Sequence, residues 1–435
     1  MKRKLSLIIL TFIVLFVFAS CDFQGFMPAD KLLKPPVLSD EQEQMKAAFE
    51  ASIKGEYTLL YPIESDNGNA FRMFDIDNDG DMECIVAYLD GNIGRVNVID
   101  KVLDEYVSVA DLTGFGDGLN FIELLDFDND GVSEILINWK NKAEDTLDVI
   151  TVFGGFSKDS LPLGAVKNLF TTDYYLFDFS DVDDDESDEL VFVSKNENEK
   201  KIARIIDYNS QTQSFSCIAE TEINQDASAF LQIISDSFND TVRYYIDEAV
   251  GEGKIATEIL LFNKNSEKFL PVFETIDKTV RNEDLLCNDI DGDGFIEIMI
   301  QTDFSGGKLI GKAGEKEISL SRVMKIENEN LVCISQLIDM GFSYTIDIYD
   351  EWLDKVTVNA NYDNQSANFY EYHLETDSTG LRLFSIRMTD TDTAPLPLEF
   401  ELGKDAEHVY YCEISVDGKD FGITEEMIKS AFVMR

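Results

Sequence analysis

The sequence predicts a mainly β protein that consists of about five repeated units followed by a small α+β domain. Three observations lead to this prediction. An acidic loop with the pattern Asp-x-Asp-x-Asp-Gly-x-x-Glu occurs four times, with one substitution in the third copy. The copies follow one another at a nearly constant spacing. Each loop runs into a short segment rich in β-branched and other apolar residues, which is typical of strands.

The acidic loops have the composition of cation sites. Each places carboxylates at loop positions 1, 3, 5 and 9, and these groups would repel one another without a cation. Oxygen ligands of this kind favour Ca²⁺, so we expect about four Ca²⁺ sites, in which position 7 contributes its backbone carbonyl. The predicted ligands are Asp75, Asp77, Asp79, Asp81 and Glu83; Asp126, Asp128, Asp130, Val132 and Glu134; Asp181, Asp183, Asp185, Ser187 and Glu189; and Asp289, Asp291, Asp293, Phe295 and Glu297.

The main alternative for such a loop is an EF-hand, which requires a bidentate glutamate at position 12 and a helix on each side. Position 12 is occupied here by Val86, Ile137, Phe192 and Ile300. All four residue types favour strands. We therefore expect each loop to join two strands, with the position-9 glutamate at the start of the second strand.

The third loop differs from the others at position 6, where Glu186 replaces glycine. A sharp turn at this position favours glycine, because a side chain adds strain to a left-handed backbone. The sequence therefore predicts a strained turn in the third loop and leaves open whether that loop binds Ca²⁺.

The spacing of the loops indicates a repeat architecture. The first aspartates of the first three loops are 51 and 55 residues apart, and the fourth loop begins 108 residues after the third, which is two steps of 54. A degenerate copy lies at the missing step, with Ser235, Ser237 and Asn239 at positions 1, 3 and 5 and Arg243 at position 9. An arginine there argues against a metal. Five units of this length, with about four short strands each, are typical of β-propeller blades.

These loops and the β-segments after them resemble the FG-GAP/VCBS repeats of integrin-α-type β-propellers. Residues 31–90 also resemble uncharacterised lipoproteins of Gram-positive bacteria, through the segments Leu32–Pro36 and Tyr57–Pro62 and the first acidic loop. The resemblance implies an FG-GAP/VCBS-type β-propeller that is extracellular, stabilised by Ca²⁺ and used for adhesion or ligand binding. It does not imply an enzyme.

The N-terminus predicts export and a lipid anchor. A basic segment, Met1–Lys4, precedes the apolar run Leu5–Ala19, and the run ends just before Cys21. This is the pattern of a signal peptide over residues 1–20. It resembles a bacterial lipoprotein signal, which implies that Cys21 carries the lipid and holds the protein on the extracellular face of the cell membrane. The alternative is an uncleaved anchor, for which the run is slightly short.

Composition excludes several classes of function. The formal net charge is −48, so nucleic acid, which requires a basic patch, is not expected as a partner. Only two histidines are present, which argues against a Ser-His-Asp triad and a histidine-based zinc site. The five cysteines other than Cys21 lie in strand-like segments without paired spacing, and we expect buried free thiols.

The expected organisation has four parts: the signal peptide over residues 1–20, a tether and helix over 21–56, the repeat region over 57–340 and a C-terminal α+β domain over 341–435. In the second part, Ser39 and Gln42 form a capping-box pattern at the start of a helix. In the last part, Trp352 is expected in the core, and Thr424–Met434 has the pattern of a helix.

The sequence favours a membrane-anchored, non-enzymatic surface protein that binds an unknown extracellular protein or glycan. The alternative is a propeller-based glycosidase or another carbohydrate-active enzyme, since such enzymes use paired carboxylates. The recognisable acids cluster in loops with ligand spacing, and this clustering favours the first hypothesis. A third hypothesis assigns only a structural role to the ions and places ligand binding in residues 341–435.

Overall fold

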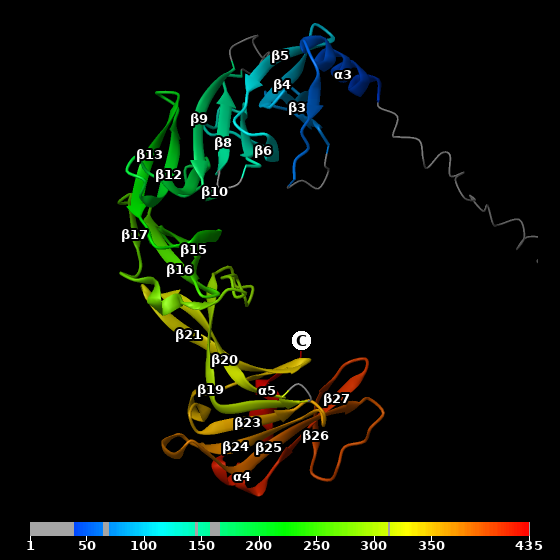
Figure 1. The fold of residues 1–435 in the computed structure, drawn as a ribbon, viewed down its shortest axis with the longest axis vertical. Helices are drawn as coiled ribbons and strands as arrows, with labels where there is room; N and C mark the ends of the chain where they lie inside the picture. Colours follow the sequence, from blue (N-terminus) through cyan, green and yellow to red (C-terminus); the bar gives the residue numbers. More distant parts are fainter. Residues whose placement is uncertain (1–38, 64–68, 144–146, 157–165, 312–313, 435) are drawn as a thin grey trace, which may run out of the picture. The chain divides into compact units, whose positions relative to one another are not determined.

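The computed structural model describes residues 39–63, 69–143, 147–156, 166–311 and 314–434. The chain divides into two compact units, one of residues 1–119 with 155–166 and one of residues 120–154 with 167–435. Both are built mainly from small antiparallel sheets, as the sequence predicts, and Figure 1 shows them in chain order. In the described part of the chain, no helix has the length and apolar character to cross a membrane. The predicted signal peptide and Cys21 lie outside the described residues.

The first unit packs one helix on a five-stranded sheet. Helix α3 (Asp40–Ser52) begins with the predicted capping box, in which the side chains of Ser39 and Gln42 each accept the other residue's backbone N–H. Its buried residues Met45 and Phe49 contact the sheet, and Phe49 meets three aromatic rings edge-on. The strands are β1 (Tyr57–Leu59), β2 (Phe71–Phe74), β3 (Glu83–Asp90), β4 (Ile93–Val102) and β5 (Glu105–Thr113).

The second unit begins with three antiparallel sheets in which successive strands are neighbours. The first contains β6 (Gly118–Leu125), β7 (Glu134–Lys140), β8 (Asp148–Gly154) and β9 (Lys167–Tyr174). The next contains β10 (Leu176–Ser180), β11 (Glu189–Lys195), β12 (Lys201–Asn209) and β13 (Ser214–Glu222). The third contains β14 (Ala229–Phe238), β15 (Thr241–Gly251), β16 (Lys254–Asn263) and β17 (Lys268–Pro271), together with the short β18 (Arg281–Asn282), which departs from this order and pairs with β16.

Neighbouring sheets of the second unit share hydrophobic cores. One core joins Leu136 and Val152 to Phe192 and Ile206, from the sheets β6–β9 and β10–β13. Another joins the inner faces of β10–β13 and β14–β17. The sheet β10–β13 contributes to both cores, so its strand β11 is almost entirely buried.

The rest of the chain forms one ten-stranded sheet in the order β26-β27-β25-β24-β23-β19-β20-β21-β22-β28. The predicted domain boundary at residue 341 falls within β21, so hydrogen bonding is continuous across it. Trp352 is buried in the core of this sheet, as predicted. The strands are β19 (Glu297–Gly311), β20 (Gly314–Glu327), β21 (Asn330–Phe342), β22 (Tyr344–Asp347), β23 (Val356–Asn361), β24 (Ser366–His373), β25 (Ser378–Asp390), β26 (Phe400–Lys404), β27 (His408–Ile414) and β28 (Phe432–Met434).

Two predictions about the second unit need correction. The C-terminal helix α5 covers only Glu425–Ala431, after the short helix α4 (Val416–Phe421). Residues Phe432–Met434 pair with β22 instead, because the apolar end of the chain extends the sheet. The five cysteines in the described residues are free, as predicted, but Cys217 on β13 and Cys333 on β21 are exposed and not buried.

Candidate metal centres

All four acidic loops stand directly before a strand that the closing glutamate begins. Glu83, Glu134, Glu189 and Glu297 are the first residues of β3, β7, β11 and β19. Strands β2, β6 and β10 precede the first three loops, whereas the fourth follows the isolated bridge between Asn288 and Glu297. These flanking strands confirm that the loops are not EF-hands.

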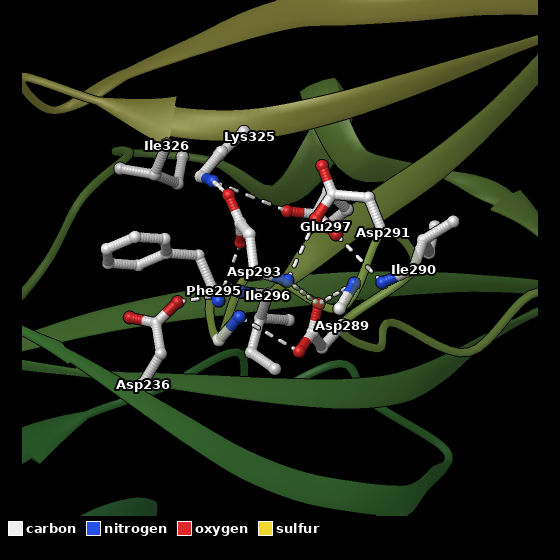
Figure 2. Close-up of polar contacts among 12 residues, drawn as sticks. Asp236, Asp289, Ile290, Asp291, Asp293, Phe295, Ile296, Glu297, Lys325 and Ile326 are labelled. Atoms are coloured by element: carbon white, nitrogen blue, oxygen red, sulfur yellow. Dashed lines mark hydrogen bonds and ion pairs between the residues drawn. The ribbon is translucent and has the colours of Figure 1, made fainter.

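A common set of hydrogen bonds shapes the loops. The position-1 carboxylate accepts the N–H groups of positions 5 and 6 in the last three loops, and Figure 2 shows this for Asp289. The position-5 carboxylate accepts the N–H of position 7, as Asp79 does from Asp81 at 2.8 Å. Position 6 has a positive φ in every loop, and Glu186 has a φ of 74°, which confirms the predicted strain in the third.

The closing glutamate connects the end of each loop to its beginning. Its Oε2 accepts the N–H of position 2, at 2.7 Å from Ile76, 3.3 Å from Phe127, 2.8 Å from Val182 and 2.8 Å from Ile290. In the first three loops the position-2 side chain is also buried. The carboxyl group is therefore held in place by a backbone hydrogen bond on one of its two oxygens.

The structure brings together the predicted ligands at positions 1, 3 and 9. In each loop, one carboxylate oxygen from each of these residues lies within 4.8 Å of the others. Among the described residues, Oε1 of Glu83, Glu189 and Glu297 is buried without a hydrogen-bond partner. The position-5 aspartates lie outside these triads, and the part that position 7 plays stays a prediction.

These triads have the properties of a site for a hard cation. All their ligand atoms are oxygens, and the buried oxygens without partners would gain a counter-charge from a bound ion. Thiol and imidazole groups, which softer metals prefer, do not contribute to any triad in the described part of the chain. The donor set fits Ca²⁺.

Burial and repulsion between neighbouring carboxylates raise the pKa of several of these groups. Burial, together with the neighbouring aspartates, raises the pKa of Glu83, Glu134 and Glu189 to about 8. The same two causes raise the pKa of Asp77 to about 6. Without a cation, Glu83, Glu134 and Glu189 therefore retain protons near neutral pH.

A lysine side chain from the neighbouring strand lies beside the carboxylates of the fourth loop (Figure 2). Lys325, on β20, forms an ion pair with Asp293, and its Nζ lies 3.8 Å from Oε1 of Glu297. This contact lowers the pKa of Asp293. The ammonium also lies 4.3 Å from the centroid of the Phe295 ring. The sequence pattern did not reveal Lys325, because it is 28 residues beyond the closing glutamate and becomes its neighbour only through sheet pairing.

The degenerate copy at Ser235–Arg243 forms a hairpin without an acidic loop. Strands β14 and β15 are joined by a two-residue turn, and Arg243 pairs across the hairpin with Asp236. Nε of Arg243 donates to Asp236 at 2.5 Å, and Nη1 donates to the carbonyl of Ile326 at 2.8 Å. Asp236 also accepts the N–H of Ile296, in the fourth loop, at 2.8 Å. The guanidinium thus supplies a positive charge at a joint that has no acidic loop.

A pair of carboxyl groups outside the loops was also missed by sequence reasoning. Glu248 on β15 is buried, Glu258 on β16 is half-buried, and Asn224 bridges them through bonds of 2.6 Å to the first and 2.8 Å to the second. Burial raises the pKa of both, to about 7 for Glu248. The available signal was a glutamate in each of two neighbouring strands that are largely apolar, because charged residues are seldom buried without a partner.

Comparisons with known proteins add a fold-level likeness only. No family model matches the chain, and no curated protein matches it. A candidate 6-phosphogluconolactonase of Bacteroides uniformis is 10% identical, with a TM-score of 0.31, and the match covers 74% of this chain and 83% of that one. Saccharomyces cerevisiae Sqt1 is 11% identical, with a TM-score of 0.30 and coverage of 82% and 98%. The rhamnogalacturonan lyase PL11 of Bacillus licheniformis is 12% identical, with a TM-score of 0.25 and coverage of 76% and 75%.

These neighbours contradict the expectation of a non-enzymatic scaffold for protein or glycan binding. They include proteins described as candidate 6-phosphogluconolactonases and a lyase, and such names agree better with the alternative of a carbohydrate-active enzyme. At this level of identity and TM-score, the likeness transfers no activity or substrate to this chain.

The raised pKa of the closing glutamates predicts how stability depends on pH. These side chains have a usual pKa of 4.5, and in the metal-free fold the pKa of three of them is about 8. The folded state therefore holds extra protons between these values, and the stability they contribute is lost as pH rises from about 4.5 to 8. We expect the Tm measured in EDTA to fall from pH 5 to pH 8. Saturating Ca²⁺ should abolish this fall, and a Tm in EDTA that rises over the interval would contradict the assignment.

Proposed function

We propose that this protein is a calcium-binding β-repeat protein in which each of the four acidic loops holds one Ca²⁺. The observation that carries the proposal is the triad of carboxylate oxygens within 4.8 Å in every loop. Each triad contains the closing glutamate, and this side chain is at most 7% exposed in all four loops. A buried anion requires a counter-charge, and Ca²⁺ accepts six to eight oxygen ligands in flexible geometry.

The ion would have a structural role. It would connect positions 1 and 3, at the end of one strand, to the first residue of the next strand, and so fix the hairpin between them. Weak Ca²⁺ sites of extracellular modules have a Kd of about 0.1–1 mM. At about 1 mM Ca²⁺, each site would then add on the order of 0.5–1.5 kcal/mol to the free energy of unfolding.

For the architecture, we propose FG-GAP/VCBS-type β-propeller units. The support is the order of strands within each repeat, which places the acidic loop in the hairpin between the first and second strands. The sheets β6–β9 and β10–β13 both follow this pattern. The sheet β14–β17 keeps the same strand order with the shortened hairpin.

Ca²⁺ stoichiometry tests the proposed function. Equilibrium dialysis of the full chain should give about four bound Ca²⁺, and the double substitution Asp126→Asn, Asp128→Asn should remove one, because it neutralises two ligands of one site. Ser235→Ala is the matched control, since this residue holds loop position 1 in the copy without a metal site, and it should leave the stoichiometry unchanged. A wild-type chain that binds no Ca²⁺, and whose Tm EDTA leaves unchanged, would overturn the proposal.

For localisation, we propose that the protein is held on the extracellular face of the cell membrane by a lipid on Cys21. The support is the basic, apolar and cysteine-terminated pattern of residues 1–21. Free Ca²⁺ outside the cell is high enough to fill weak sites of the kind proposed.

Metabolic labelling tests the anchor. Cells that express the protein should incorporate labelled palmitate into it, and Cys21→Ala should abolish the label, because the acceptor thiol is lost. Cys217→Ala is the control, since this exposed cysteine lies in the folded region. Equal labelling of the Cys21→Ala chain and the wild type would exclude the anchor.

A second candidate function is the processing of a carbohydrate by Glu248 and Glu258. The specific observation in its favour is that Glu248 has a pKa of about 7 and one buried oxygen without a hydrogen-bond partner among the described residues. A carboxyl group in this state can act as a general acid near neutral pH, and glycosidases pair such a group with a second carboxylate. In this chain, Glu258 would be the second group.

A substrate screen tests this candidate. If the chain cleaves any of a panel of plant and bacterial glycans, Glu248→Gln should lower kcat on the order of 100-fold or more, because the proton donor is removed. Glu222→Gln, at an exposed glutamate paired with Lys200, is the control and should leave kcat unchanged. Full activity of a correctly folded Glu248→Gln chain would exclude the assignment, and so would the absence of any cleavage by the wild type.

A further inference from the structure

We propose that the residue opposite each closing glutamate, on the next strand of the same sheet, sets the Ca²⁺ affinity of that loop. Asp100 and Asp207 would add a carboxylate to the first and third sites, Gly154 would leave the second unchanged, and Lys325 would oppose binding at the fourth. This inference rests on the proposed function and assigns three charged residues to the sites that the loop motif does not contain.

Strand register places these residues at equivalent positions. Glu297 and Lys325 are direct partners on β19 and β20. The pair Cys84 and Ile99, continued by one residue, sets Glu83 opposite Asp100, and the pair Leu190 and Ile206 likewise sets Glu189 opposite Asp207. In the second loop, the pair Ile135 and Phe153 sets Glu134 opposite Gly154.

The side chain at this position faces the closing glutamate. At Gly154, an added Cβ would lie 3.0 Å from Cγ and 3.2 Å from Oε1 of Glu134. It would also lie 2.5 Å from Leu169, so the packing of the second site leaves no room for a further ligand. Position 154 thus shows directly what a side chain at the equivalent positions would meet.

The negative charges of Asp100 and Asp207 influence the carboxyl groups of the triads, as expected from the strand register. Asp100 is 5% exposed, and its charge contributes to the raised pKa of Glu83 and Asp77. Asp207 is half-buried, and its charge contributes to the raised pKa of Glu189. An additional anion that repels the triad in the absence of metal attracts a divalent cation to it.

Two other lysines form ion pairs with aspartates of these loops. Lys101 pairs with Asp81 at 3.3 Å, so the two largely cancel at the edge of the first loop. Lys264 pairs with Asp184 of the third loop, at position 4, which is not a ligand position. Neither ammonium contacts a triad carboxylate in the ion pairs of the described residues.

Lys325 has the opposite effect because it already neutralises the fourth triad. Its ammonium lies between Asp293 and Glu297, against the ring of Phe295, and its side chain is 13% exposed (Figure 2). A Ca²⁺ ion in this loop would have to displace the ammonium or tolerate its repulsion. We therefore expect the fourth site to be the weakest.

The resulting order of affinity is the first and third sites, then the second, then the fourth. A unit charge a few ångströms from a divalent ion changes its affinity on the order of tenfold or more, even when solvent screens the interaction. The strained turn at Glu186 lowers the third site relative to the first. The effect of the opposite charge on Ca²⁺ affinity is therefore best measured by comparing the wild type with a variant that changes only that charge, at the same site.

Calorimetric Ca²⁺ titration of the full chain tests the inference. Lys325→Gln should tighten the weakest site on the order of tenfold or more, because it removes the competing cation and keeps a polar side chain of similar reach. Asp100→Asn should weaken one of the tightest sites by a similar factor. Lys429→Gln, at an exposed ion pair more than 100 residues beyond the last loop in the sequence, is the control for the change in net charge and should leave all sites unchanged.

A variant that lacks the fourth site shows whether the effect of Lys325→Gln arises at that site. In a chain that also carries Asp289→Asn and Asp291→Asn, Lys325→Gln should no longer change any Ca²⁺ affinity, because the fourth site is lost. Four bound ions with an unchanged weakest site in Lys325→Gln would overturn this inference and leave the proposed function intact. A wild-type chain that binds no Ca²⁺ would overturn both.

Discussion

The burial of the closing glutamate is the constraint on which each acidic loop depends. This carboxyl group begins a core strand, and in three of the four loops its exposed fraction is zero. One oxygen accepts the N–H of loop position 2, which fixes the turn, and the carboxyl group has an oxygen within 4.8 Å of oxygens from two aspartates. A carboxylate in such a place is stable only with a proton or a cation nearby. The hairpin, the apolar residue at position 2 and the raised pKa values all follow from this placement.

The repeats differ in the group that supplies positive charge beside the hairpin. The fifth copy uses Arg243 as a fixed cation and keeps only a two-residue turn, so its hairpin needs no ion. The fourth loop keeps the acidic motif and adds Lys325 beside it. The first and third loops have an acid at the position of this lysine. These differences indicate that the hairpin itself is the conserved element of the repeat, and that the source of positive charge can vary from unit to unit.

Features that depend on near neighbours in the chain could be predicted from the sequence, whereas contacts that arise from pairing between strands could not. Loop spacing, the strand-like residues at position 12 and the capping box of Ser39 depend on near neighbours in the chain, so they could be predicted. Lys325 faces Glu297 only because β19 pairs with β20, and Asp236 meets Ile296 across 60 residues. The end of α5 was misplaced for a similar reason, since Phe432–Met434 gain a strand partner in β22 that the helical pattern does not show.

Packing between sheets implies that the proposed metal sites of the second unit would not act independently. Val182, at position 2 of the third loop, belongs to a core that also contains Tyr244 and Leu260 of the following sheet. Phe127, at position 2 of the second loop, packs in the same core as Phe192 of the sheet that carries the third. Position 2 is bonded to the closing glutamate in each loop, so a change in the charge of that glutamate reaches the shared core directly. An ion bound at one hairpin would therefore also stabilise the sheet beside it, and the free energies of the proposed sites would not be strictly additive.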